Sequence, residues 1–179
     1  SLNSMLFYNA YASSSVCSPT RAAIMTGKHP ARVNITDWIP GLEEQPHYNN
    51  KNKPLIGPQD LNELPLSEIT IAEVLKKNGY KTFYSGKWHL GSEGHYPEDQ
   101  GFDINVGGFE KGSPMGGYYT PYKNPKLEDG PDGEYLTDRL TQETIDFIDS
   151  RDESKPFAAF LAFYNVHTPI QENKEFYDY

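Results

Sequence analysis

The stretch Ser15-Val16-Cys17-Ser18-Pro19-Thr20-Arg21 holds the only cysteine of the 179-residue chain. Pro19 suits the first turn of a helix, because the fixed φ of proline fits there and its missing N–H would have no partner anyway. The run Ala22-Ala23-Ile24-Met25 continues that helix, and Gly27 is a natural end for it. Cys17 is therefore predicted at or just before a helix N-terminus, where unpaired N–H groups and the helix dipole favour negative charge.

Arg21 follows Cys17 by about one helical turn, so its guanidinium can reach back to the same helix N-terminus. A sulfur atom, a helix N-terminus and a guanidinium together predict a site for a tetrahedral anion. A lone cysteine is also often no more than a small buried hydrophobic residue. A phosphate-binding P-loop ending at Gly27-Lys28 would need glycine at position 22 and serine or threonine at position 29, where the chain has alanine and histidine. A cysteine-phosphatase loop has five residues between Cys and Arg, and this chain has three.

The composition describes an acidic chain with room for one domain and long ordered loops. Apolar residues make up 36%, glycine and proline contribute 15 and 14 residues, and the net charge is −9. This charge argues against a nucleic-acid-binding surface, although a local cationic pocket can coexist with it. No apolar run reaches the length of a membrane span, and a single cysteine excludes an internal disulfide. The chain opens on Ser1 without a signal peptide, and we interpret it as a fragment.

The pattern of apolar residues predicts alternating helices and strands. Thr70 and Glu73 form a capping box at the start of a helix that ends near Gly79, with an apolar stripe of Ile71, Val74 and Leu75. A strand is predicted over 80–85, a helix over about 137–150 and a strand buried on both faces over 157–164. A short apolar run over 5–11 is interpreted as a buried strand that leads to the cysteine. This alternation predicts one α/β unit.

Two further motifs lie at the ends of predicted strands, where the sites of α/β sheets gather. In Gly86-Lys87-Trp88-His89-Leu90-Gly91, an extended backbone would turn Lys87 and His89 to one side and Trp88 to the other. In Asn165-Val166-His167-Thr168-Pro169-Ile170, a histidine follows the apolar strand. Alone, the first pair could be a solvated sheet edge and the second a structural histidine.

Taken together, the three motifs resemble those of one enzyme family. Residues 17–21 are similar to the Cys-x-Pro-Ser/Thr-Arg signature of the type I, formylglycine-dependent sulfatases of the alkaline-phosphatase-like superfamily. Residues 86–91 resemble the second signature of these sulfatases, and residues 167–169 resemble their His-x-Pro segment. The resemblance implies an α/β fold with a mixed, mostly parallel sheet flanked by helices. It also identifies 1–179 as the N-terminal portion of a catalytic domain, without its first strand and its C-terminal part.

The resemblance further implies a role for each motif residue. In the family, a maturation enzyme oxidises the cysteine, here Cys17, to Cα-formylglycine, and a hydroxyl of its hydrate attacks the sulfur of a sulfate ester. Arg21 would hold the hydrated aldehyde, and Lys87 would bind sulfate oxygens. His89 would take a proton from the second hydroxyl, and His167 would bind near the leaving oxygen and protonate it.

The family also holds a divalent cation, usually Ca²⁺, which the resemblance would place on Cys17 as formylglycine. The other ligands are expected outside this chain, because no further set of oxygen ligands is recognisable in it. Four loop carboxylates are instead interpreted as solvated or capping residues: Asp37, Asp60, Asp99 and Asp103. A 179-residue piece by itself is therefore expected to have little or no activity.

The expected substrate is a sulfate ester of a carbohydrate. Asn34-Ile35-Thr36-Asp37-Trp38 and His167-Thr168-Pro169-Ile170 resemble bacterial enzymes of the arylsulfatase and N-acetylgalactosamine-6-sulfatase branch, whose location is periplasmic or secreted. Two alternatives stay open. One is a phosphonate monoester or phosphodiester hydrolase that uses the same modified cysteine, and the other is a catalytically dead relative that binds sulfated glycans.

Overall fold

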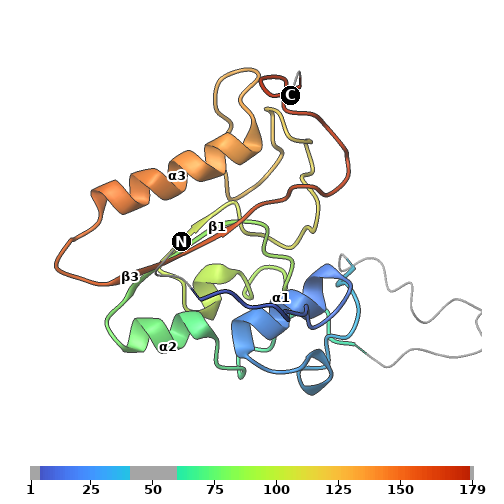
Figure 1. Cartoon of the computed structure of the whole chain (residues 1–179), viewed down its shortest axis with the longest axis vertical. Helices are drawn as coiled ribbons and strands as arrows, with labels where there is room; N and C mark the ends of the chain where they lie inside the picture. Colours follow the sequence, from blue (N-terminus) through green and yellow to red (C-terminus); the bar gives the residue numbers. More distant parts are fainter. Residues whose placement is uncertain (1–4, 41–59, 178–179) are drawn as a thin grey trace, which may run out of the picture.

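The computed structural model describes residues 5–40 and 60–177. Along these residues helices alternate with strands (Figure 1). In chain order the elements are α1 (Cys17–Thr26), η1 (Pro30–Arg32), α2 (Ile71–Lys77), β1 (Lys81–Gly86), η3 (Pro97–Gln100), β2 (Ile104–Val106), α3 (Leu136–Ser150) and β3 (Phe157–Ala162).

The three strands of the described residues form a parallel sheet in the order β2-β1-β3. Strand β1 is central, and its pairing with β3 runs from Lys81 opposite Phe157 to Gly86 opposite Ala162. Helix α3 covers one face of the sheet, and α1 and α2 lie on the other (Figure 1). This arrangement confirms the α/β prediction, and it places the carboxyl ends of β1 and β3 at one edge.

Helix α1 forms as its sequence predicts. It begins at Cys17 after an extended Val16, which has a φ of −125° and caps the helix without a side-chain hydrogen bond. Pro19 lies in its first turn. Gly27 ends the helix in the left-handed region at a φ of 68°, and its N–H donates to the carbonyl of Ala23. Cys17 is therefore the first residue of α1, at the end where the backbone N–H groups have no partner within the helix.

Helix α2 has the predicted capping box, but the prediction of its buried face was wrong. The amide of Glu73 donates to Thr70 Oγ1 at 3.2 Å, and the amide of Thr70 donates to Glu73 Oε2 at 2.7 Å. Ala72 is fully buried, whereas Ile71 and Val74 are 40% and 48% exposed. The buried Thr70 hydroxyl donates to the carbonyl of Gln100 at 2.6 Å, and this anchor turns the Ala72 side toward the core. Two helical turns carry too few apolar residues to predict a face.

The prediction of a buried strand over 5–11 was also wrong. These residues form no strand, and their apolar side chains are 70–89% exposed at positions 5, 6, 7, 8 and 11. A strand must pair its N–H and C=O groups with a neighbour. In the sheet of the described residues, β2 and β3 occupy both sides of β1, and neither pairs with 5–11.

Strand β3 is shorter and less buried than predicted. It spans Phe157–Ala162 rather than 157–164, and its residues are only partly buried, because β1 flanks it on one side within the described sheet. The core lies closer to β1. Tyr84, Trp88 and Phe102 pack edge to face on the side of α1 and α2. A second buried cluster, which includes Tyr118 and Leu140, lies beneath α3.

Candidate active site

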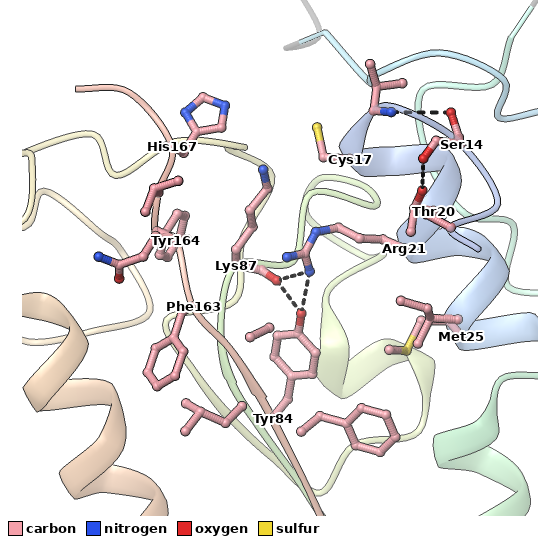
Figure 2. Close-up of a pocket in the computed structure, with 18 of the residues that line it drawn as sticks. Ser14, Cys17, Thr20, Arg21, Met25, Tyr84, Lys87, Phe163, Tyr164 and His167 are labelled. Carbon is pink, nitrogen blue, oxygen red and sulfur yellow. Dashed lines mark hydrogen bonds between the residues drawn. The ribbon is translucent and has the colours of Figure 1, made fainter. Parts of the chain in front are cut away.

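The N-terminus of α1 faces the carboxyl ends of β1 and β3 across a cleft (Figure 2). The cleft has a volume of about 560 Å³ and is lined by Cys17, Arg21, Lys87 and His167 among others. A second cleft of about 430 Å³ is lined by Val16, Cys17, Trp38, His89 and His167. All five residues that the sequence motifs single out therefore line one or both of two clefts, and Cys17 and His167 are common to both.

His89 contacts Cys17 directly. Its Nδ1 lies 3.2 Å from Cys17 Sγ, and its Nε2 lies 2.8 Å from the carbonyl oxygen of Ile39. A carbonyl can only accept, so Nε2 carries the hydrogen of the neutral ring and Nδ1 presents its lone pair to residue 17. Burial lowers the pKa of His89 to about 4, although the Ile39 hydrogen bond opposes the shift. The cations of Lys87, Arg21 and Lys111 lower it further, so the ring is a neutral acceptor at pH 7.

The backbone that carries His89 differs from the extended geometry expected from the sequence. Strand β1 ends at Gly86, and His89 has a φ of 57°, in the left-handed region that non-glycine residues rarely adopt. Trp88 is fully buried and donates its indole N–H to the carbonyl of His95 at 2.8 Å. A β-carbon on Gly112 would lie 2.4 Å from Cε1 of His89, so only glycine lets this segment approach the ring.

Lys87 is 5% exposed, yet its ammonium points into the space between Cys17 and His167 (Figure 2). Its amide donates to the carbonyl of Ala162 at 2.8 Å, which ties the residue to the end of β3. Burial lowers the pKa of Lys87, the side chain of Cys17 opposes this shift, and the Arg21 cation adds to it. An anion bound between these side chains would replace the lost hydration of the ammonium.

Arg21 is held by a partner that the sequence did not reveal. Its Nη1 donates to Tyr84 Oη at 3.1 Å and to the carbonyl of Lys87 at 2.5 Å. The Tyr84 hydroxyl also donates to the same carbonyl. Burial raises the pKa of Tyr84 despite the nearby Arg21 cation, so its hydroxyl remains protonated and can donate. Tyr84 occupies an ordinary strand position, and no local pattern in the sequence marks it.

His167 faces Cys17 across the cleft from the chain that follows β3 (Figure 2). Its ring is exposed, and Nδ1 lies 2.9 Å from the carbonyl oxygen of Thr168. Its amide donates to the carbonyl of Tyr164, and Tyr118 Oη donates to its own carbonyl at 2.9 Å. These two hydrogen bonds fix the backbone of His167 beside the cleft.

All four loop carboxylates have structural partners, and Asp37 accepts from the amide of Trp38 at 2.8 Å. Asp60 accepts from the amide and hydroxyl of Thr36 at 2.8 Å each, and Asp99 accepts from the amide of Tyr96 at the start of η3. Asp103 pairs with the ammonium of Lys76 at 3.0 Å. Over residues 5–40 and 60–177, no group of three or more His, Cys, Asp or Glu side chains is placed to hold a metal ion. The described residues thus do not by themselves form a cation site.

No helix in the described ranges combines the length and the apolar character that crossing a bilayer requires.

Comparisons with known proteins agree with the three motifs. The sequence model of the Sulfatase family matches residues 2–179. An arylsulfatase of Hemicentrotus pulcherrimus is 31% identical over 192 residues, which cover 95% of this chain and 32% of the relative. The N-acetylgalactosamine-6-sulfatase of Homo sapiens is 29% identical over 191 residues, which cover 96% of this chain and 34% of that protein.

Solved structures share the fold. The crystal structure of Ps i-CgsB in complex with k-i-k-neocarrahexaose superposes with a TM-score of 0.68 at 25% identity, over 92% of this chain and 38% of that one. The structure of BT4656 in complex with its substrate D-glucosamine-2-N,6-O-disulfate gives a TM-score of 0.62 at 26% identity, over 90% of this chain and 27% of that one. The chain spans about a third of the length of the curated relatives that it matches.

Proposed function

The chain belongs to the sulfatase family, and we propose that the intact protein hydrolyses sulfate esters at the cleft between α1 and the ends of β1 and β3. The observation that carries the proposal is the convergence of a nucleophile position, two cations and two histidines on the same pair of clefts. The relatives are sulfatases, and this favours sulfate esters over the phosphonate and phosphodiester substrates considered as alternatives.

We propose that Cys17 is converted to Cα-formylglycine by a maturation enzyme, and that its hydrate supplies the hydroxyl that attacks sulfur. A cysteine thiolate could not complete such a cycle, because release of sulfate needs a second hydroxyl on the same carbon. The position at the first residue of α1 suits this group, since the helix N–H groups and dipole favour the negative charge that develops there.

The side chains around residue 17 divide the proton and charge movements among them. Lys87 binds sulfate oxygens and balances the charge that builds in the transition state, and Arg21 holds the hydrated residue 17. Neutral His89 presents Nδ1 to residue 17, so it can accept the proton whose loss expels sulfate. His167 faces the ester oxygen from the other side of the cleft and gives a proton to the departing alcohol.

Family membership also suggests a divalent metal ion. We propose calcium, with oxidised residue 17 as one ligand and the remaining oxygen ligands outside the described residues. None of the steps above passes through this ion, because the described residues do not form its site.

The proposed substrate class is a sulfated carbohydrate. One relative acts, by its name, on N-acetylgalactosamine 6-sulfate, and one structural neighbour binds D-glucosamine-2-N,6-O-disulfate. We further propose that the protein works in a periplasm or outside the cell, where sulfated polysaccharides are met.

The test compares the intact wild-type protein, produced with a maturation enzyme, with Cys17→Ala, Lys87→Ala and the exposed control Lys155→Ala. Mass spectrometry of the tryptic peptide ending at Arg21 should find the aldehyde in the wild type. Lys87→Ala should lower kcat on sulfate esters about 10²- to 10³-fold, as loss of a transition-state donor does, and Lys155→Ala should leave it unchanged. Faster turnover of phosphate diesters or phosphonate monoesters than of sulfate esters would overturn the proposal.

A further inference from the structure

The second cleft contains an aromatic side chain that has no role in the proposed reaction. Trp38 lines this cleft with Cys17, His89 and His167, and it is 39% exposed. We propose that the Trp38 indole is the platform on which the sugar ring of the substrate, the leaving alcohol, stacks during hydrolysis. This inference rests on the proposed sulfate ester hydrolysis and names the part of the site that selects the alcohol.

The backbone next to Trp38 is anchored to the site on two sides. The amide of Ile39 donates to the buried Ser18 Oγ in α1 at 2.9 Å, and its carbonyl accepts from His89 Nε2 at 2.8 Å. The Ile39 side chain is 6% exposed and belongs to the core, whereas the neighbouring indole is exposed at the cleft. A side chain on a segment fixed in this way has little backbone freedom to lose when a ligand binds, so it is preorganised for stacking.

The two clefts differ in charge. The first contains the ammonium of Lys87 and the guanidinium of Arg21. Among the described residues, the second is lined by Val16, Cys17, Trp38, His89 and His167, and none of these is a lysine, an arginine or a carboxylate. The first cleft therefore suits the sulfate group, and the second suits an uncharged ring with apolar C–H faces and a rim of hydroxyls. An indole can cover such a face while the hydroxyls keep their contacts with water.

His167 lies where the two clefts meet. It lines both clefts, as Cys17 does, so the ester oxygen that it protonates lies where the sulfate side meets the ring side. A ring held on Trp38 would fix the direction of the sulfur–oxygen bond relative to residue 17. Binding energy from a part of the substrate that does not react would then serve orientation at the part that does.

The experiment measures binding by calorimetry to the intact protein carrying Cys17→Ala, so that no probe is consumed. The probes are inorganic sulfate, galactose 6-sulfate and N-acetylgalactosamine 6-sulfate. We expect at least one hexose sulfate to bind more tightly than inorganic sulfate. Adding Trp38→Ala should lower the affinity for that hexose sulfate about tenfold, which is the scale of one aromatic contact. The affinity for inorganic sulfate should stay within about twofold of the parent.

Two further variants separate stacking from general structure. Trp38→Phe keeps an aromatic face, so hexose sulfate affinity should stay within about threefold of the parent. Tyr177→Ala removes an aromatic side chain that is 72% exposed and lines neither cleft, and it should change nothing.

Three results would overturn the platform while leaving sulfate ester hydrolysis intact. In the first, Trp38→Ala weakens the affinities for inorganic sulfate and for the hexose sulfate equally. In the second, it changes neither affinity. In the third, the parent binds no hexose sulfate more tightly than it binds inorganic sulfate. Failure of the proposed function looks different, because inorganic sulfate would then not bind the parent at all, and the platform would fall with it.

Discussion

At the scale of single residues, His89 shows how burial adjusts a base. Its ring is 5% exposed and has two polar neighbours, the Ile39 carbonyl and residue 17. Loss of hydration and, to a smaller extent, nearby cations disfavour a second proton, so Nδ1 remains an acceptor down to a pH of about 4.

The lowered pKa of His89 predicts that acid destabilises the fold. Above pH 6.5 the ring is neutral in the folded and unfolded states, but between 6.5 and about 4 only the unfolded chain takes up the proton. The free energy of unfolding should therefore fall by up to about 3 kcal/mol across this window because of this residue. Urea unfolding of the wild type and His89→Gln at pH 7.5, 5.5 and 4.5 measures the difference.

His89→Gln should show the flatter dependence on pH, and replacement of the exposed His29 by Gln should leave the wild-type slope in place. Parallel slopes for the wild type and His89→Gln would contradict the prediction.

Tyr84 acts at the same scale, but through other residues. Its buried hydroxyl accepts from Arg21 and donates to the Lys87 carbonyl, so it holds both cationic residues in register across the cleft. Tyr84→Phe leaves the bond between Arg21 and that carbonyl, and removes the other two. We expect a loss of about 1 kcal/mol in unfolding free energy and a fall of about tenfold in kcat/KM for sulfate esters from the looser placement.

Tyr122→Phe is the matched control for this change. Tyr122 is 2% exposed, close to the 1% of Tyr84, and its hydroxyl donates to Glu134 away from the two clefts. It should lose comparable stability without the loss of kcat/KM. Equal effects of both variants on kcat/KM would show that Tyr84 supports the fold only.

At the scale of elements, the site depends on how closely β1 and β3 approach where they end. Gly86 has a φ of 100°, and a β-carbon on it would lie 2.1 Å from the carbonyl oxygen of Ala162. That carbonyl accepts from the amide of Lys87. The close approach of the two strand ends therefore fixes the position from which the Lys87 side chain extends into the cleft.

Gly86→Ala should separate the two strand ends and lower the unfolding free energy by about 2 to 4 kcal/mol, the sum of a left-handed alanine and a backbone clash. Gly94→Ala is the control, because Gly94 has a similar φ of 87° with no atom within 4 Å of its β-carbon. It should cost only about 1 kcal/mol. Chemical denaturation of both variants gives the comparison, and equal losses would exclude the clash.

At the scale of the whole molecule, the described residues bring together the side chains that we propose to bind sulfate and transfer protons, but no set of metal ligands. A protein limited to these residues should therefore not hydrolyse 4-nitrophenyl sulfate, with or without added calcium. The intact protein is the positive control under the same conditions. Calcium-dependent turnover by the 179-residue piece, abolished by a chelator, would refute this expectation.

Much of the fold and of the site was predictable because its determinants are local. The proline and glycine at the two ends of α1, the Thr70 capping box and the apolar runs of β1 and β3 act over a few residues, and each formed its element. The three motifs also singled out Cys17, Arg21, Lys87, His89 and His167, and the structure places all five at the two clefts.

Only the tertiary structure decided which groups support these residues. The hydroxyl of Tyr84, the carbonyl of Ile39 and the space above Gly112 lie 63, 50 and 23 positions from the residues they serve. No short window of sequence contains both partners of such a contact. The same reason explains the errors over 5–11 and on α2, because burial and strand pairing depend on which distant segments lie alongside, and local propensity does not contain that information.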